Sequence, residues 1–148
     1  MINQLKFKII LFFISFLYSN LSFATNPIYQ DIINNNKEPV KIEAEENKQY
    51  YIITFNLNDK IWLYEKHLKV KINNVYIPLF DVKNLMISTT SKKVNDEFYG
   101  QVFVYIKNVS FYIPKSNFNK KPNLVIQYIA CDFVNGVCFP PKNKELIF

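Results

Sequence analysis

QVFVYIK, residues 101–107, alternates its side chains with a period of two. Val102, Val104 and Ile106 would point one way along an extended chain, and the aromatic residues between them would point the other way. Successive side chains of a β-strand lie on opposite faces, whereas a helix repeats every 3.6 residues. The stretch therefore predicts a strand.

Similar runs, rich in aromatic and β-branched residues, occur on both sides of this strand. They are VKIEAE (40–45), QYYIITFNLN (49–58), KIWLYEKHLKVKI (60–72), NLVIQYIA (123–130) and KELIF (144–148). Turn signals such as NLND, KINNV and KSNFNKKPN separate the runs, and no amphipathic helix is predicted after the first 24 residues. Seven or more short strands in about 110 residues predict an all-β, immunoglobulin-like antiparallel β-sandwich. The two cysteines are too close in sequence for the disulfide arrangement of antibody domains.

Residues 1–24 have the composition of a secretory signal peptide. Two lysines precede the apolar run IILFFISFLY at residues 9–18, and Ser22 and Ala24 are small residues two positions apart. We expect cleavage after Ala24. An uncleaved membrane anchor is the alternative, but a membrane span needs about 20 apolar residues.

The rest of the chain divides into a polar, asparagine-rich linker at residues 25–37 and one domain at residues 38–148. The formal net charge of the whole chain is +6, of which Lys6 and Lys8 contribute two, so the exported part carries +4. Its lysines are scattered and arginine is absent from the sequence. We therefore expect a mildly basic, solvated surface and no binding to nucleic acid.

Both cysteines lie in IACDFVNGVCFPP, residues 129–141. Asn135 and Gly136 signal a tight turn with positive φ, so Cys131 and Cys138 are expected on facing strands near a hairpin tip, within reach of one disulfide. In an oxidising compartment such a pair tends to be bonded. A bond that closes so short a loop contributes roughly 2.5 kcal/mol by chain entropy, against nearly twice that for a very long loop. The pair is thus poorly placed as a staple, and both a structural disulfide and a working dithiol remain open.

Metal binding and hydrolase chemistry have little support in the sequence. The two cysteines and the lone His67 provide at most three ligands, with no fourth. We expect His67 on an exposed strand face, and no motif around it indicates a nucleophilic hydrolase. No cofactor is expected.

DEFYG, residues 96–100, comes directly before QVFVYIK and contains the other glycine of the chain. DEFYG, followed by a C…GxC loop, an aromatic residue and two prolines, resembles the N-terminal periplasmic domain of the thiol:disulfide interchange protein DsbD. IWLYEKHLKV, residues 61–70, is similar to the early aromatic strand of that domain. The resemblance covers residues 53–148 and implies an immunoglobulin-like sandwich.

The resemblance implies that Cys131 and Cys138 are a redox pair, in which Cys138 enters mixed disulfides with partner proteins. It also implies a cap loop over the disulfide, consisting of Asp96, Glu97, Phe98, Tyr99 and Gly100. Within this loop, the ring of Phe98 would cover the sulfurs until a partner displaces it.

We expect aromatic residues beside the redox pair from the resemblance, and we expect an effect of acidic residues on physical grounds. Trp62 and Tyr64 match aromatic positions that line the site, and ordinary core packing is the alternative for both. The acidic residues Asp96, Glu97 and Asp132, if they lie near the sulfurs, would disfavour the thiolate in the isolated domain.

In the family, the domain accepts electrons from a thioredoxin-like domain that is fed by a membrane segment. It passes them to periplasmic thioredoxin-fold acceptors, such as disulfide isomerases and cytochrome c maturation thioredoxins. The resemblance therefore implies an exported, monomeric thiol:disulfide oxidoreductase of the periplasm, with a thioredoxin-like donor and a membrane electron transporter in trans. The alternative is a non-catalytic exported β-sandwich that binds proteins and contains a structural disulfide.

The sequence departs from the family pattern in two places. Six residues, DFVNGV, separate the cysteines, where the family usually has five. The chain also stops at Phe148, so we expect the membrane and thioredoxin-like domains on separate chains, or lost.

Overall fold

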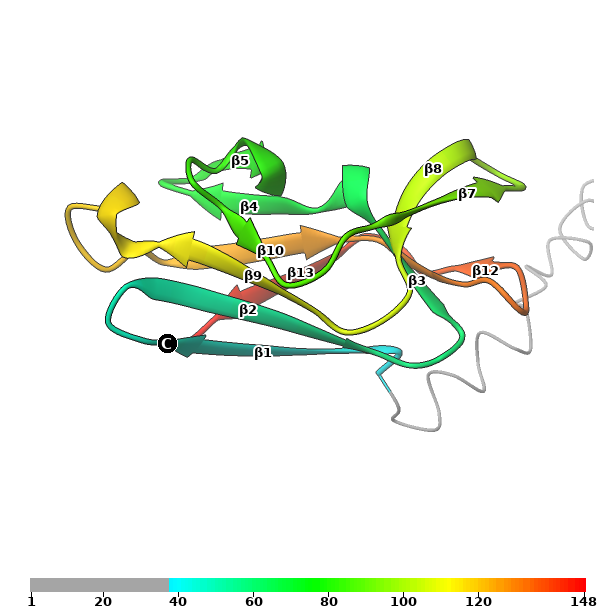
Figure 1. Cartoon of the computed structure of the whole chain (residues 1–148), viewed down its shortest axis with the longest axis horizontal. Coiled ribbons are helices and arrows are strands. Elements are labelled where there is room, and N and C mark those ends of the chain that lie inside the picture. The colour runs from blue at the N-terminus through cyan, green and yellow to red at the C-terminus, as the bar shows by residue number, and fades with distance from the viewer. Residues whose placement is uncertain (1–37) are drawn as a thin grey trace, which may run out of the picture. The chain divides into compact units, whose positions relative to one another are not determined.

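The computed structural model describes residues 38–148, and the predicted signal peptide and linker, residues 1–37, lie outside this part of the chain. The strands are arranged in three antiparallel sheets (Figure 1). The helical elements among the described residues are three short 3₁₀ turns, η1 (Glu65–His67), η2 (Leu79–Asp81) and η3 (Lys115–Asn117). Residues 38–148 thus contain no helix with the length and apolarity that a membrane crossing requires.

The first sheet has the strand order β1–β2–β9–β6. These strands are β1 (Val40–Glu46), β2 (Tyr50–Leu57), β9 (Val109–Pro114) and β6 (Met86–Ile87). β2 and β9 are rich in the β-branched and aromatic residues that pack well on a pleated surface. Phe55 of β2 and Phe111 of β9 are fully buried and meet edge to face, with ring centroids 5.8 Å apart.

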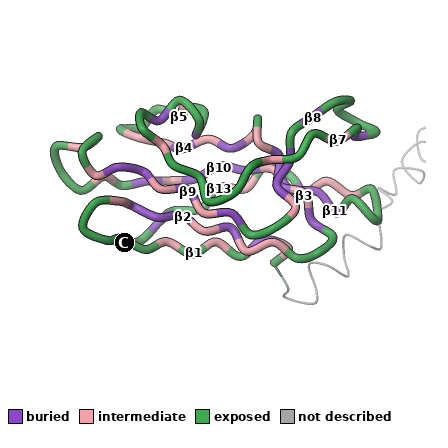
Figure 2. The backbone as a smooth tube through the Cα atoms, in the orientation of Figure 1, coloured by how far each residue is buried: buried purple, intermediate pink, exposed green. Residues whose placement is uncertain are grey.

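The second sheet has the order β13–β10–β4–β5. Its strands are β13 (Lys142–Leu146), β10 (Leu124–Tyr128), β4 (Lys69–Ile72) and β5 (Val75–Pro78). Along β10, buried residues alternate with half-buried ones. The ring of Tyr128 meets Phe55 of the first sheet, with centroids 5.7 Å apart. The two sheets are therefore the two layers of a sandwich, and Figure 2 shows the buried stretches of their strands.

The third sheet has the order β12–β11–β3–β8–β7 and carries the cysteines. Its strands are β12 (Val137–Cys138), β11 (Ala130–Asp132), β3 (Ile61–Tyr64), β8 (Gly100–Tyr105) and β7 (Lys92–Asp96). β10 leads almost directly into β11, and β3 leads through η1 into β4, so the third sheet continues the second at one end. Figure 1 shows the β7–β8 hairpin and β12 together at that end.

The strand predicted from QVFVYIK is β8 and ends at Tyr105. Val102 and Val104 are buried, and Phe103 between them is half exposed, as the period of two predicts. Tyr105 was predicted on the face of Phe103 but is also buried, because its ring meets Phe111 of the first sheet at a centroid distance of 5.6 Å. β8 is thus covered on both faces where it enters the sandwich.

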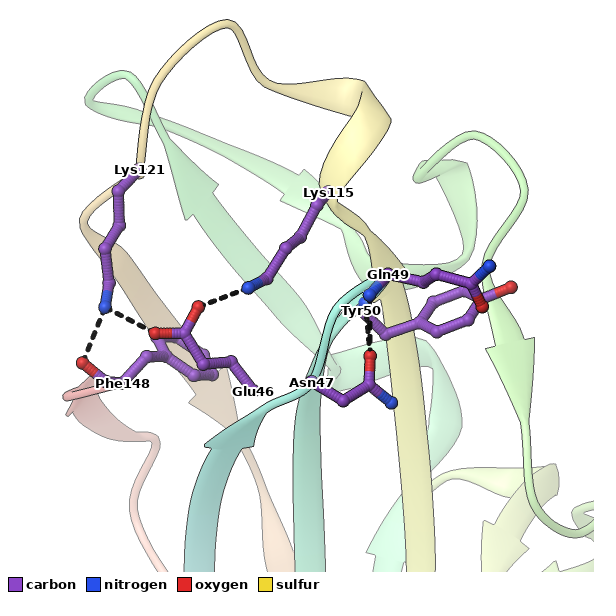
Figure 3. A network of polar contacts seen from close by, with 7 residues as sticks. All are labelled: Glu46, Asn47, Gln49, Tyr50, Lys115, Lys121 and Phe148. Atoms are coloured by element: carbon purple, nitrogen blue, oxygen red, sulfur yellow. Dashed lines mark hydrogen bonds and ion pairs between the residues drawn. The ribbon is translucent and has the colours of Figure 1, made fainter.

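A polar network joins the end of β1, η3, the loop after η3 and the last residue of the chain (Figure 3). The carboxylate of Glu46 accepts hydrogen bonds from Lys115 at 2.5 Å and from Lys121 at 2.7 Å. Lys121 also donates to the carbonyl oxygen of Phe148 at 2.7 Å. Asn47 accepts from the backbone N–H groups two and three residues later, which shapes the β1–β2 turn. In Figure 1 this network lies at the end of the sandwich away from β12, so it takes no part in the site below.

Candidate functional site

A cavity of about 370 Å³ opens between the loop that joins β7 to β8 and the hairpin that joins β11 to β12. Of the site residues expected from the sequence, those that line it are Trp62, Tyr64, Asp96, Glu97, Phe98, Cys131 and Cys138. Tyr99 and Gly100 belong to the same loop but do not line the cavity. Residues from four strands of the third sheet thus meet at one place.

Cys131 of β11 lies directly opposite Cys138 of β12, and the two form a disulfide. The six intervening residues therefore do not prevent the pairing. Cys131 is only 3% exposed and packs against Tyr64 and the buried valines of β8. Cys138 is half-buried. A sulfur that approaches from solvent consequently finds Cys138 more accessible than Cys131.

The hairpin that carries the disulfide has a four-residue loop, residues 133–136, in place of the tight turn expected at Asn135 and Gly136. Only Gly136 has a positive φ, at 63°, whereas a two-residue type I′ turn needs positive φ at both central positions. Asp132 explains the wider turn. Its Oδ1 accepts from the backbone N–H groups of Val134 and Asn135 at 3.0 Å each, and its Oδ2 accepts from the Asn135 side chain at 2.8 Å. The carboxylate substitutes for backbone pairing in an Asx turn.

The cap loop, residues 96–100, has a similar turn. Oδ1 of Asp96 accepts from the backbone N–H groups of Phe98 at 2.8 Å and Tyr99 at 2.7 Å. Gly100 closes the loop with a φ of 69°. The Phe98 side chain lines the cavity, yet Phe98 is 66% exposed. The backbone of the loop is therefore held in place, while its largest apolar ring stays at the surface.

Tyr64 connects the cap loop to β3. It is fully buried, and its hydroxyl donates to Oδ2 of Asp96 at 2.5 Å. Burial, followed by this hydrogen bond to the charged carboxylate, raises the pKa of Tyr64 well above its ordinary value. Burial alone would raise the pKa of Asp96, but the hydrogen bonds from Tyr64 and from the loop backbone, with the nearby charge of Lys66, hold it below its ordinary value. At neutral pH the pair is a phenol and a carboxylate.

Trp62 lies beside the disulfide on β3, directly opposite Cys131 in the register of β3 and β11. It is half-buried. Its ring stacks on Phe133 of the cysteine hairpin, with centroids 4.8 Å apart and an interplanar angle of 15°. Trp62 is therefore a wall of the cavity, and it contacts the hairpin loop through this stack.

Lys66 and His67 contact Tyr99 of the cap loop, and neither was predicted as a site residue. The ring of Tyr99 meets Tyr64 at 5.4 Å and His67 at 5.7 Å, and the ammonium of Lys66 lies 4.8 Å above its centroid. His67 is in η1, partly buried with its Nε2 atom enclosed, so the prediction of an exposed strand face is wrong. The 3₁₀ turn η1, which follows β3, places the side chains of Lys66 and His67 against Tyr99 of the cap loop. Only the spacing of YEKH after the aromatic strand could have suggested this.

Two apolar residues of the hairpin loop, Phe133 and Val134, also line the cavity and were not predicted as site residues. The signal for them was the length of the loop, because the residues between the cysteines include an apolar pair that no turn requires. Within residues 38–148, no group of three His, Cys, Asp or Glu side chains is placed to hold a metal ion.

A family model described as "Thiol:disulfide interchange protein DsbD, N-terminal" matches residues 30–148. The chain belongs to the DsbD N-terminal family. Its curated relatives include DsbD of Haemophilus ducreyi, which is 27% identical over 88 residues that make up 60% of this chain and 14% of the relative. DsbD 1 of Pseudomonas aeruginosa is 27% identical over 98 residues, 66% of this chain and 16% of the relative. The chain thus matches about one seventh of the length of these DsbD proteins.

Two solved structures of DsbD N-terminal domains, both from Neisseria meningitidis, resemble the chain. The reduced form of that domain superposes with a TM-score of 0.60 at 22% identity, covering 76% of this chain and 89% of that one. The other structure is a complex between the DsbD N-terminal and PilB N-terminal domains, with a TM-score of 0.59 at 21% identity, covering 75% and 83%. The prediction of an immunoglobulin-like antiparallel β-sandwich is confirmed.

Proposed function

We propose that this chain is an exported thiol:disulfide oxidoreductase that relays reducing equivalents through the Cys131–Cys138 pair. The observation that carries the proposal is the asymmetry of the disulfide, which lies in a cavity with one buried and one half-buried cysteine. Membership of the DsbD N-terminal family supports the same chemistry. The redox domain would span residues 38–148, after a cleaved signal peptide at residues 1–24 and a linker at residues 25–37, and would work as a monomer in the periplasm.

The accessible cysteine determines the order of the steps. A donor thiolate attacks Sγ of Cys138, so that a mixed disulfide forms and Cys131 leaves as a thiolate. The second thiol of the donor, once deprotonated, attacks the donor sulfur that is bonded to Cys138. Cys138 then leaves as a thiolate. The donor is then oxidised to a disulfide, and this domain holds two reduced cysteines. Toward an acceptor disulfide, Cys138 attacks first and Cys131 resolves the complex, which carries the same two electrons onward.

The cap loop would protect this chemistry between partners. Phe98 lines the cavity from the loop, opposite the hairpin that carries the cysteines. Asp96, Glu97 and Asp132 line the same cavity, and negative charge near a thiol disfavours its thiolate. Isolated reduced protein would therefore react slowly with small oxidants, and a docked partner would have to displace Phe98.

The proposed partners are thioredoxin-fold proteins. The donor would be a thioredoxin-like domain supplied by a membrane electron transporter in trans, and the acceptors would be periplasmic thioredoxin-fold proteins. The Neisseria complex between the DsbD N-terminal and PilB N-terminal domains supports a protein partner for this fold.

A second candidate function is a non-catalytic protein-binding sandwich, in which the disulfide is structural. The burial of Cys131 against Tyr64 and the β8 valines favours it, because this sulfur fills space in a core cluster. The two functions differ in the reduction potential of the pair, since a structural disulfide resists reduction in the glutathione range.

Cysteine variants test the proposal directly. Cys138→Ala should abolish oxidation of a reduced thioredoxin while the circular dichroism spectrum stays native, because the short loop adds little stability. Cys131→Ser should leave Cys138 to accumulate a mixed disulfide that survives non-reducing electrophoresis. A Cys138→Ala protein that unfolds outright would favour the structural disulfide, and mixed disulfides formed by Cys131 alone would reverse the two roles.

A further inference from the structure

Three exposed apolar side chains border the cavity that contains the disulfide. Phe98 of the cap loop is 66% exposed, and Phe133 and Val134 of the cysteine hairpin are 43% and 57% exposed. Exposed apolar residues are ordinary when scattered, but a group of them around a reactive bond marks a surface that another molecule can cover. The two loops hold these side chains differently.

Three sets of contacts restrain Phe133. Its backbone N–H donates to the carbonyl oxygen of Lys60 at 3.1 Å, just before β3. The carboxylate of Asp132, the residue before it, accepts from the backbone N–H groups of Val134 and Asn135, which fixes the turn. Its ring lies flat on Trp62 at 4.8 Å. The Phe133 side chain is therefore ordered although nearly half of the residue faces water.

The position of this stacked pair constrains any protein that reacts here. Trp62 is the direct cross-strand neighbour of Cys131, which in turn is the direct cross-strand neighbour of Cys138. A partner that brings a sulfur to Cys138 must place the surface around its own cysteine over the neighbouring strands. Aromatic rings that are ordered before binding lose little entropy in the complex, which is why such residues dominate protein interfaces.

We propose that Phe133, stacked on Trp62 and flanked by Val134, is a preformed docking platform that sets the affinity for thioredoxin-fold partners. The partner would contact it with the apolar surface beside its reactive cysteine. This inference rests on the function proposed above and adds the residues that select a protein partner over a small thiol. Phe98 is displaced during docking, whereas Phe133 stays in place and is covered.

The test is the kinetics of reduction of the oxidised chain by two reductants, reduced thioredoxin and dithiothreitol. Phe133→Ser should raise KM for thioredoxin about tenfold, in the range found for single interface residues, and leave kcat unchanged. The rate with dithiothreitol should not change, because a small dithiol makes no contact with the platform. Phe133→Tyr, which keeps the stacked ring, should behave as wild type.

Two further variants keep the result clear. Val134→Ser should raise KM in the same direction by a smaller factor, and it provides the test if Phe133→Ser fails to fold. Phe103→Ser is the matched control, since Phe103 is 50% exposed on β8 but does not line the cavity, and it should leave both reductants unaffected.

The outcomes separate the platform from the proposed function. If wild-type protein reacts with thioredoxin and the variants at Phe133 and Val134 keep its KM, the platform is wrong and the function stands. Equal acceleration with both reductants would make Phe133 a second cap, which also contradicts docking. If dithiothreitol reduces the wild type but no thioredoxin-fold protein does, the proposed function fails, and the platform fails with it.

Discussion

In the cap loop, Asp96 binds the backbone N–H groups two and three residues later, and Gly100, four residues on, closes the turn with a φ of 69°. In the cysteine hairpin, Asp132 binds the N–H groups two and three residues later, and Gly136, again four residues on, has a φ of 63°. Both aspartates are buried, and both loops place a phenylalanine at the surface of one cavity.

The loops differ in what restrains these phenylalanines. Phe133 is stacked on Trp62, and a disulfide closes its hairpin. Phe98 has no aromatic partner among the described residues, and the cap loop is held instead through the hydrogen bond of Tyr64 and the ring of Tyr99. The same turn chemistry thus fixes the backbone of both loops. Side-chain contacts restrain the ring of Phe133 and leave that of Phe98 at the surface.

The largest difference between the loops should come from removing the two aspartates. Asp96→Ala should lower the free energy of unfolding by about 2–3 kcal/mol, because it leaves the buried hydroxyl of Tyr64 and two N–H groups without their acceptor. Asp132→Ala should cost about 1–2 kcal/mol, since the disulfide still closes the hairpin. Urea denaturation of the oxidised proteins measures both. Equal losses of unfolding free energy in the two variants would mean that the disulfide does not stabilise the hairpin. The same measurement on reduced protein is the control.

A smaller and equal effect is expected at the two glycines. Gly100→Ala and Gly136→Ala should each cost about 1 kcal/mol, because an L-residue with a side chain pays that much for a left-handed backbone. An added Cβ would meet nothing within 4 Å at either position, so no clash contributes. Asparagine, which tolerates this conformation, should cost less at both sites. A loss of several kcal/mol at one site alone would contradict the likeness of the two turns.

Removal of the cap should change reactivity more than stability. Phe98→Ala should speed reduction of the disulfide by dithiothreitol, and alkylation of the reduced thiols, several-fold, because the ring no longer obstructs the sulfurs. The free energy of unfolding should change by no more than about 0.5 kcal/mol, as for most exposed side chains. Phe103→Ala is the matched control on β8. Unchanged rates, or a loss of several kcal/mol, would rule out gating by Phe98.

The smallest effect should be the pH dependence of the free energy of unfolding that comes from His67, which packs against Tyr99 of the cap loop. Burial, and then the charges of Lys66 and Lys69, lower the pKa of His67 below its ordinary value of 6.5. A base with a lowered folded-state pKa takes up its proton more readily when unfolded, so its contribution is intact above about pH 6.5 and is lost as the pH falls below it.

His67→Gln should therefore lose less stability than wild type, by under about 1 kcal/mol, between about pH 7.5 and pH 5.5. Unfolding curves across this range measure the effect. Identical pH profiles would show that His67 does not report on the packing of Tyr99.

The sequence was sufficient for the fold class because strands follow from local patterns of side chains. Alternation in QVFVYIK and similar runs predicts strands, and the buried Val102 and Val104 agree with it. DEFYG and the cysteine loop could be related only through their likeness to a known family, since 30 residues separate Gly100 from Cys131 in sequence. The cavity that brings them together depends on the pairing of β3 with both β8 and β11.

Side-chain partnerships across strands could not be predicted in the same way. The stack of Phe133 on Trp62 depends on a four-residue turn, and the sequence NG suggested a tighter one because the acceptor role of Asp132 was overlooked. His67 was expected on a strand because it lies within an aromatic and β-branched run, but the chain turns there through η1. In both cases a short polar contact or a single helical turn overrides the period of the surrounding residues.

The short distance between Cys131 and Cys138, seven positions apart in sequence, has a consequence for the reduction potential of the disulfide. In a thermodynamic cycle, the extra stability that a disulfide gives the folded chain equals the extra free energy needed to reduce it in that fold. Loop entropy of about 2.5 kcal/mol corresponds to a potential about 50 mV more negative than that of the same cysteines in an unfolded chain. A bond that closed a loop of about 100 residues would lower the potential by about 100 mV. Cysteines that are close in sequence therefore form a pair that is easier to reduce than one that closes a long loop.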